Sequence, residues 1–340
     1  MAKYELPPMR PESVVCPRCE DSANGRIGIH SQKERRYKCH VCGVTFSDSY
    51  GTPLYGLKHP SWLVIVVLTL LAYGCPVPAI VAALGIDERT VAAWRLKAGQ
   101  HAQAVQQALV CQGQLELGQV QGDEFYVKTQ CGGVWIATAM SVFSRLLIWG
   151  AISIERNTTL VTQVVAQVKA AAAPQQPLLW AVDGFGAWSS AILHLFRAPL
   201  HTGQPGRPRL VVWPHLHLVQ VVKRYTGRCL HAVERRLLHG AQPVAEEMVL
   251  TSQVNWGCFN TAYIERLNAT FRTWVPFATR KTRTPAARRL HLQAAFFWTA
   301  VVYNFCHVHA SLQATPAMAA GLVDSGWSIV QLLRYRLKRE

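Results

Sequence analysis

The pattern of apolar and polar positions divides the chain into three parts. Residues 12–50 are polar and rich in cysteine, whereas residues 60–100 carry apolar side chains at helical spacing. Strand-like and helical patterns then alternate from about 115 to 310. The most apolar run, at 62–73, is about a dozen residues long, and a membrane span needs about 20. We therefore predict a buried helix there and no attachment to a membrane.

Strand signals open the stretch from 115 to 310. Three β-type runs separated by turn residues are typical of an antiparallel meander: 119–127, 134–142 and 145–154. Helix and strand signals then alternate, with Asn157 or Thr158 as the first N-cap: 157–173, 178–182, 187–196, 210–213, 258–275 and 285–307. The order βββαβαβ followed by helices resembles a ribonuclease-H-like fold, an α/β architecture in which helices flank a mixed sheet.

The net charge of the chain indicates what kind of partner it binds. Lys and Arg number 35 against 19 Asp and Glu, which gives a formal net charge of +16, while half of the residues are hydrophobic. A chain with enough apolar residues for real cores and this excess of positive charge predicts a polyanionic partner, most often nucleic acid. A basic surface kept for solubility is the alternative. With no export signal evident, we expect a cytoplasmic, nucleoid-associated protein.

Four of the ten cysteines form two pairs, Cys16-x2-Cys19 and Cys39-x2-Cys42, with nineteen residues between them. Each pair forms a tight knuckle that presents two thiolates, and two knuckles complete a tetrahedral zinc site. The alternatives are redox-active cysteines or a chance pairing. Because four thiolates leave no position for a substrate, we predict a structural Zn²⁺ that holds a small ribbon together.

Residues 77–94 have the form of a helix-turn-helix. A short apolar helix ends before Gly85, and Asp87 can cap a second helix. That second helix carries candidate DNA contacts for the major groove: Arg89, Thr90, Arg95 and Lys97. An ordinary helical hairpin is the alternative.

Two aspartates stand alone in the long α/β stretch. Asp123 and Asp183 are the only ones between residues 98 and 310, and each lies in or directly after a predicted strand. In the expected sheet order these strands are neighbours, so the carboxylates would repel each other unless cations were bound. Paired Mg²⁺ or Mn²⁺ ions at such carboxylates serve phosphodiester chemistry. Glu124 is a rival to Asp123, and a turn aspartate before Gly184 is the alternative for Asp183.

A third carboxylate is expected from the helix at 258–275. At 100° per residue, Glu265, Asn268 and Arg272 fall within about 60° of one another, while apolar residues occupy the opposite face. One face therefore packs, and the other presents an acid, an amide and a guanidinium together. A solvated Glu–Arg face is the alternative.

Taken together, these motifs resemble a bacterial insertion-sequence transposase of the DDE class, in the group with an N-terminal zinc ribbon. The similarity covers roughly residues 14–322, and the family's third-acid motif E-R-x-N-x-x-x-R fits at Glu265, Arg266, Asn268 and Arg272. The resemblance implies that Asp123, Asp183 and Glu265 hold Mg²⁺ or Mn²⁺. It also implies 3′-end cleavage followed by strand transfer, with transposon ends and target DNA as partners and a homodimer or larger synaptic assembly.

Basic residues downstream fit this interpretation. The stretch from 266 to 323 has no acid, and it contributes further candidate DNA contacts beside Asn268: Arg266, Arg272, Arg280, Lys281 and Arg283. A second group is expected in an insertion, as a contact for DNA or a partner subunit or else as a solvated helix face: Lys223, Arg224, Arg228, Arg235 and Arg236.

The expected organisation has four parts: a zinc ribbon at 12–50, a helix-turn-helix domain at 58–100, a catalytic domain at 115–310 with an insertion around 214–257, and a basic tail at 311–340. Two other functions stay open. One is a DNA-binding regulator derived from a transposase and without cleavage activity. The other is a ribonuclease-H-like nuclease acting on a junction or on RNA.

Overall fold

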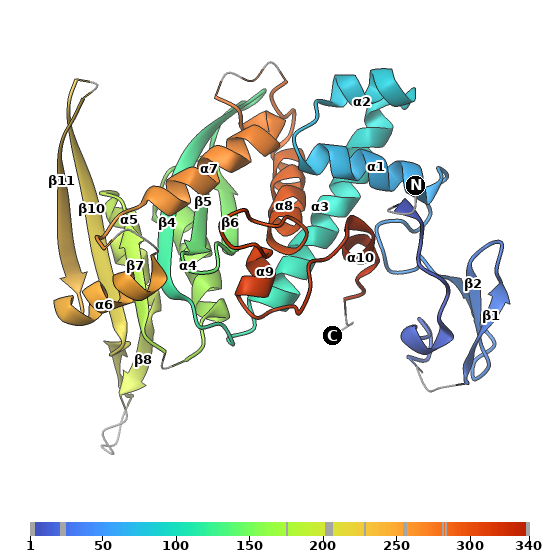
Figure 1. Cartoon of the computed structure of the whole chain (residues 1–340), viewed down its shortest axis with the longest axis horizontal. Helices are drawn as coiled ribbons and strands as arrows, with labels where there is room; N and C mark the ends of the chain where they lie inside the picture. The colour runs from blue at the N-terminus through green and yellow to red at the C-terminus, as the bar shows by residue number, and fades with distance from the viewer. Residues whose placement is uncertain are drawn as a thin grey trace.

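A six-stranded mixed sheet makes up one side of the computed structural model, which describes residues 4–20, 25–174, 176–200, 207–227, 229–253, 257–280, 282 and 284–337 (Figure 1). The strands lie in the order β11-β10-β7-β4-β5-β6. Their bounds are β4 (Gly118–Thr129), β5 (Gly132–Ser141), β6 (Leu147–Ser153), β7 (Leu178–Val182), β10 (Leu216–Thr226) and β11 (Cys229–His239).

Strand directions confirm the expected meander and the expected neighbours. β4, β5 and β6 pair antiparallel in sequence order. β7 pairs parallel with β4 on one side and with β10 on the other, and its pairing with both ends at Val182. β7 consists wholly of buried residues, as a central strand covered on both faces requires. The first and fourth strands are therefore adjacent, as predicted.

Helices cover both faces of the sheet. Side chains alternate along a strand, so the adjacent β4 residues Gly122 and Gln121 face opposite sides of the sheet. A Cβ on Gly122 would lie 2.7 Å from Trp188 of α5 (Gly186–Leu195), which contacts α4 (Thr158–Ala171). Gln121 instead accepts a hydrogen bond from the backbone of Ile264 in α7 (Ala262–Trp274), on the face that α6 (Gln242–Ser252) also covers. The predicted α4 cap is confirmed, since Asn157 accepts from Leu160 N–H at 3.0 Å.

The segment between α5 and α7 differs from expectation. The strand expected at 210–213 forms β9 (Arg209–Val212), but β9 pairs only with β8 (Arg197–Leu200) in a separate hairpin. The sheet strand is β10, from the segment expected to be an insertion. Four of the five residues that pair with β7 are buried, and three of them, Leu216, Leu218 and Val219, are apolar. Lys223 and Arg224 come after that pairing ends, so the β10–β11 hairpin extends past β7.

α7 begins at Ala262 rather than at 258. The Asn260 side chain accepts a hydrogen bond from Ala262 N–H at 3.0 Å and so closes a turn before the helix. After α7 come a short 3-10 turn, η3 (Pro276–Ala278), and the long helix α8 (Arg289–Phe305).

The two helices, the glycine turn and the aspartate cap expected at 77–94 are present, and their buried residues belong to the main core. α1 (Ser61–Ala72) precedes α2 (Val77–Leu84), Gly85 ends α2 with φ 63°, and Asp87 caps α3 (Glu88–Val110). α3 runs through the boundary expected near residue 100 and packs against α8. Gly99 allows this approach, because a Cβ there would lie 2.2 Å from the Ala294 carbonyl oxygen.

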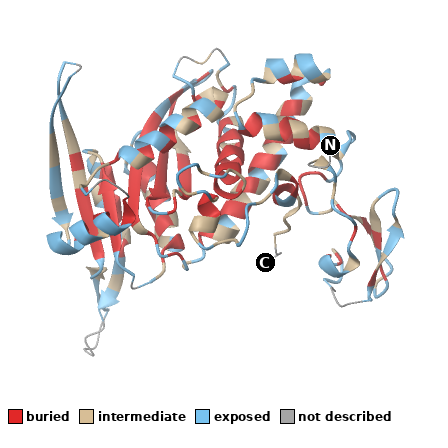
Figure 2. Ribbon diagram, viewed as in Figure 1, coloured by how far each residue is buried: buried red, intermediate tan, exposed pale blue. Residues whose placement is uncertain are grey.

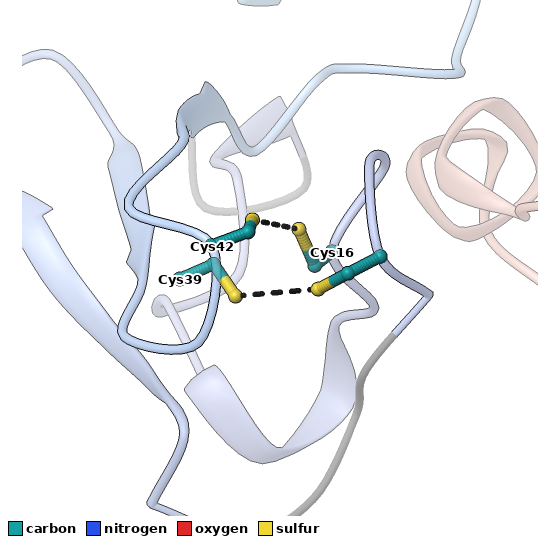
Figure 3. A group of neighbouring side chains, drawn as sticks. Cys16, Cys39 and Cys42 are labelled. Carbon is teal, nitrogen blue, oxygen red and sulfur yellow. Dashed lines mark hydrogen bonds between the residues drawn. The ribbon is translucent and has the colours of Figure 1, made fainter.

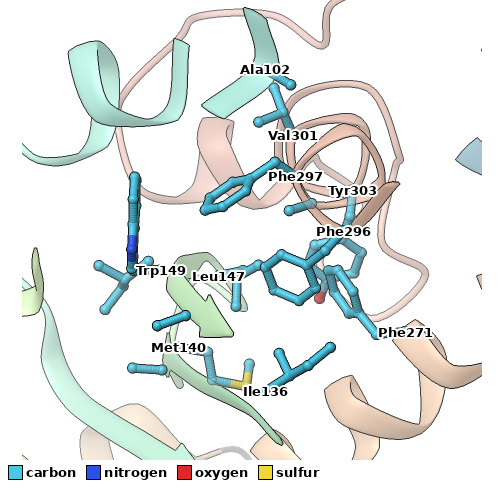
Figure 4. Packing of buried hydrophobic residues seen from close by; sticks show 14 of the residues in the cluster. Ala102, Ile136, Met140, Leu147, Trp149, Phe271, Phe296, Phe297, Val301 and Tyr303 are labelled. Carbon is cyan, nitrogen blue, oxygen red and sulfur yellow. The ribbon is translucent and has the colours of Figure 1, made fainter. Parts of the chain in front are cut away.

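One hydrophobic core therefore joins the helices to the sheet. Figure 4 shows Ala102 of α3 beside Val301 and Phe297 of α8, with Trp149 of β6 on the other side. The same core takes in Phe271 of α7, and Figure 2 shows that buried residues are concentrated in the sheet and in the helices beside it.

The N-terminal ribbon has a small core of its own. It contains η2 (Pro11–Ser13) and a three-stranded sheet, β1 (Ile27–Ser31), β2 (Arg36–Cys39) and β3 (Thr45–Ser47). Ile27, Tyr37 and Phe46 pack there with the buried cysteines.

The C-terminal segment expected as a basic tail is folded onto the molecule. α9 (Pro316–Ala319) and α10 (Ile329–Arg334) pack on α8, and α10 also contacts α1 and α3. Arg334 and Arg35 both pair with Asp48, which links the ribbon to α10. Among the described residues, no helix has the length and apolar character to cross a membrane.

Candidate metal centres and basic surfaces

The four cysteines of the two CxxC pairs converge, as predicted (Figure 3). The Cys16 and Cys42 sulfurs lie 3.5 Å apart and those of Cys19 and Cys39 lie 3.6 Å apart, and all four lie within 4.8 Å of one another. A disulfide needs about 2.05 Å, whereas four sulfurs around one zinc ion stand about 3.8 Å apart. The spacing therefore suits a tetrahedral metal ion.

Both knuckles share one backbone pattern. Glu20 N–H donates to the Cys16 carbonyl at 3.0 Å, and Gly43 N–H donates to the Cys39 carbonyl at 2.9 Å. Burial raises the pKa of Cys16, but backbone N–H groups of the first knuckle and the neighbouring thiols outweigh it and lower the pKa to about 7. Cys16 therefore ionises more readily than a free thiol, to the form that binds metal, whereas burial and the neighbouring thiols of Cys16 and Cys39 raise the pKa of Cys42.

A second cluster forms where β7 ends beside β4. Oxygen atoms of Asp123, Glu124 and Asp183 all lie within 4.8 Å of one another. Asp123 continues β4 past the last β7 pair, and Asp183 is the residue directly after β7. The parallel pairing of the two strands brings the carboxylates together at the carboxyl end of β7, which is a usual place for ligand sites in α/β sheets.

Asp123 is held from the α7 side. Asn268 Nδ2 donates to Asp123 Oδ2 at 2.9 Å, and the hydroxyl of Thr138 donates to Asn268 Oδ1 at 2.8 Å. Burial, followed by repulsion from Glu124 and Asp183, raises the pKa of Asp123 to about 7. An ionised Asp123 is therefore costly unless a positive charge stands beside it.

Glu124 is buried and fully engaged by other side chains. Oε1 accepts from Arg156, with Nε at 2.7 Å, and Oε2 accepts from the Trp188 indole at 2.8 Å. Burial and the charge of Asp183 still raise its pKa. Arg156 also lies 3.8 Å from Asp183 and stacks on Phe185 at 4.2 Å, so this arginine supplies positive charge to the cluster.

Glu265 does not join these three carboxylates. It pairs with Lys223 of β10 and accepts a hydrogen bond from the Thr261 hydroxyl at 2.6 Å. Its helix is nevertheless aligned with the site, because Asn268, one turn further along the same face of α7, contacts Asp123. Sequence motifs favoured Asp123 over Glu124 and indicated no role for Arg156, since no local pattern shows which side chains a distant strand will meet.

Some of the side chains predicted to contact DNA are exposed, and others are buried or half-buried. Arg89, Lys97, Arg266 and Arg280 are exposed, and Thr90 is half-buried. Arg95 is 6% exposed, and its guanidinium lies 4.3 Å from the Phe277 ring centroid, so it is not on the surface of the second helix.

Arg272 is half-buried over the ring of Phe125, at 5.1 Å from the centroid. Burial and the charge of Arg280 lower its pKa, while Asp123 raises it. In the second basic group, Lys223, Arg224, Arg235 and Arg236 lie on β10 and β11 rather than on a helix. Lys281, Arg283 and Arg228 lie outside the described residues.

Comparison with known proteins adds no identification, because no family model and no curated protein matches the chain.

Proposed function

We propose that this chain is a DDE-class DNA transposase with a ribonuclease-H-like core, which binds the ends of an insertion sequence and catalyses metal-dependent 3′-end cleavage and strand transfer. The main support for this proposal is that Asp123 in β4 and Asp183 at the end of β7 lie together in a half-buried cluster that favours cation binding. The net charge of +16 and the four-cysteine ribbon support a nucleic-acid partner.

Asp123 and Asp183 would hold Mg²⁺ or Mn²⁺, and Zn²⁺ would fill the four-cysteine site. Bound at the aspartates, the divalent ions activate an attacking oxygen and stabilise a leaving one. Thr138 fixes the amide of Asn268, which in turn fixes one oxygen of Asp123 and leaves the carboxylate aimed at the cluster. Arg156 sits beside Asp183 and is available to a phosphate oxygen.

The reaction has two balanced steps. In the first, the oxygen of water bonds to phosphorus at the element end, the bond from phosphorus to the 3′ oxygen breaks, and a 3′-hydroxyl and a 5′-phosphate result. In the second, that 3′-hydroxyl bonds to a phosphorus of target DNA and releases the target's own 3′-hydroxyl. Each phosphodiester exchanges one oxygen for another, so no external energy source is needed.

For the third carboxylate we favour Glu265 over Glu124. Both oxygens of Glu124 already accept hydrogen bonds from Arg156 and Trp188. The Glu265 side chain is 44% exposed, and its partner Lys223 is itself a residue that a DNA phosphate can attract. On this view, arrival of DNA and cations releases Glu265 to the cluster.

The exposed Arg280 would contact the DNA backbone beside the site, Arg266 would contact it on the opposite face of α7, and Arg89 and Lys97 would contact it at α3. Binding of two transposon ends implies a homodimer or larger synaptic assembly. A regulator that binds DNA without cutting it is the competing function, favoured by the pairing of Glu265 with Lys223 in this conformation.

The test is a cleavage assay with Mg²⁺ or Mn²⁺ on a labelled duplex that carries the DNA flanking the gene. We expect a 3′ nick at the element boundary, lost in Asp123→Asn without loss of DNA binding. Asp324→Asn, at an exposed aspartate outside the cluster, is the matched control and should cut normally. Tight binding with no metal-dependent nick would favour the regulator. Equal loss of binding in Asp123→Asn would reject the catalytic role.

A further inference from the structure

A cavity of about 620 Å³ lies along the other face of α7. At 100° per residue, Tyr263, Arg266 and Thr270 stand roughly 140–160° around the helix from Asn268, which faces the acid cluster. The remaining walls come from the β5–β6 turn and from the segment after α8, including His309. The cavity is therefore separate from the acid cluster but shares one helix with it.

Positive and proton-donating groups dominate the polar lining. Arg145, Arg266, His307 and His309 all line the cavity, and no carboxylate is found among its described lining residues. His309 Nδ1 accepts a hydrogen bond from Ser311 N–H at 3.3 Å. In the neutral ring the proton is then on Nε2, which is a donor. This lining suits an anion.

Arg145 is held in an unusual conformation. Its φ is +59°, a left-handed conformation that costs free energy for a residue with a side chain. The guanidinium lies 4.1 Å from the Tyr263 ring centroid and donates to the Val142 carbonyl. The Tyr303 hydroxyl donates to the Arg145 carbonyl at 3.2 Å, which fixes the turn from the other side. The arginine is thus positioned before any ligand arrives.

Aromatic rings lie next to these cations. Phe143 is 61% exposed at the cavity, although a large apolar side chain in a tight turn gains nothing from facing water. Trp274 meets His307 edge-on at 4.8 Å and forms another part of the wall. Aromatic faces beside arginines are the surfaces on which unpaired bases stack next to their phosphates.

We propose that this cavity binds one unpaired nucleotide of a DNA end, with its phosphate at Arg145 and Arg266 and its base against Phe143. The choice of DNA as the source of the nucleotide rests on the proposed function. The inference that the ligand combines an anionic group with a planar ring depends only on the arginines and aromatic rings of the cavity. A free nucleotide has the same chemistry, so the test must separate the two sources.

The test compares the affinity of the full zinc-loaded chain for a blunt duplex and for the same duplex with a short single-stranded extension, without added Mg²⁺ or Mn²⁺. We expect the extension to tighten binding by about tenfold, since stacking of one base is worth that much. Phe143→Ala and Arg145→Gln should each abolish this gain while binding the blunt duplex as the parent chain does. Val308→Ala, an exposed residue that does not line the cavity, should keep the gain.

An equal gain in Phe143→Ala, Arg145→Gln and the parent chain would overturn the proposal. The proposal would also be overturned if thymidine monophosphate competed completely with the extended duplex at the concentration at which that duplex binds. The cavity would then be a mononucleotide site. Thermal unfolding of each variant checks that it is folded. This experiment measures binding and not cleavage. A negative result in the transposase assay would therefore not change the difference in affinity, and each proposal can be rejected without the other.

Discussion

Asp123 and Asp183 could be predicted from the sequence because each is tied to a strand with a clear apolar pattern. The strands fix the backbone, and the parallel pairing of β4 with β7 then fixes where the two carboxylates meet. The third carboxylate could not be predicted in the same way. The structure places Glu124 in the cluster and Glu265 against Lys223, and this arrangement depends on partners such as Arg156 and Lys223, which come from elements far apart in the sequence.

The raised pKa of Asp123 predicts a pH dependence of stability. Its pKa rises from 3.8 to about 7 on folding, so the folded chain binds more protons than the unfolded chain between these values. The free energy of unfolding therefore falls as pH increases through this window. Without divalent cations, Asp123→Asn should match the parent chain near pH 3.5, below this window, and exceed it by about 1–2 kcal/mol at pH 8. Urea unfolding at several pH values measures this.

Mn²⁺ provides the control for that prediction. It should stabilise the parent chain at pH 8 and stabilise Asp123→Asn much less, because the variant keeps Asp183 and the Arg156-paired Glu124 but has lost one of the two carboxylates proposed to hold the ion. A difference between the two chains that does not vary with pH would show that Asp123 is not the titrating group.

Arg156 should be important for stability through Glu124. The Glu124 side chain is 1% exposed, so removal of its ionic partner leaves a buried charge. We expect Arg156→Met to lower the free energy of unfolding by about 2 kcal/mol, less than for a wholly buried pair because Arg156 is 38% exposed. The double variant Glu124→Gln/Arg156→Met should recover most of this loss in a urea titration. Additive losses would show that the pair is not coupled.

At the scale of elements, the apolar pattern predicted the strands of the meander, the buried strand β7 and the main helices, whose periods are clear. It missed the β8–β9 hairpin and the role of β10. The basic half of β10 looks unlike a sheet strand because it extends beyond its parallel neighbour, and only the tertiary pairing of its first residues with β7 shows where it belongs.

The ribbon should depend on metal, and the rest of the molecule should not. Its core is separate from the main core and small, so metal binding must supply much of its folding free energy. Cys39→Ser or a strong zinc chelator should unfold residues 12–50 while α3, α8 and the sheet persist. Hydrogen exchange resolved by peptide measures this. Protection of the ribbon in chelator equal to that with zinc would contradict the assignment of a four-cysteine zinc site.

The close crossing of α3 and α8 predicts intolerance at Gly99. A Cβ there would lie 2.2 Å from a backbone oxygen of α8, which cannot move without shifting the helix. We expect Gly99→Ala to destabilise the chain by about 3 kcal/mol. Gly186→Ala is the matched control, because Gly186 begins α5 with open space around its Cβ position, and it should be near neutral. Equal thermal unfolding of the two variants would show that the crossing can relax.

At the scale of the whole molecule, the sequence predicted separate head and core domains, and the structure joins the helical head to the core. The apolar residues of α3 looked like those of a small independent bundle because their partner, α8, lies nearly 200 residues away. The ribbon keeps a core of its own, and the Asp48 pairs with Arg35 and Arg334 connect it to the C-terminal segment. A DNA contact at α3 would therefore be rigidly placed relative to the acid cluster.

The proposed function requires that Asp123 and Asp183 form a divalent-cation site. Its most direct test is Mn²⁺ binding to the full zinc-loaded chain at pH 8, followed through the loss of the electron paramagnetic resonance signal of free Mn²⁺. We predict binding by the parent chain and by Asp324→Asn, and a strong loss of affinity in Asp183→Asn. Undiminished binding in Asp183→Asn, or no binding by the parent chain even with end DNA present, would contradict the account.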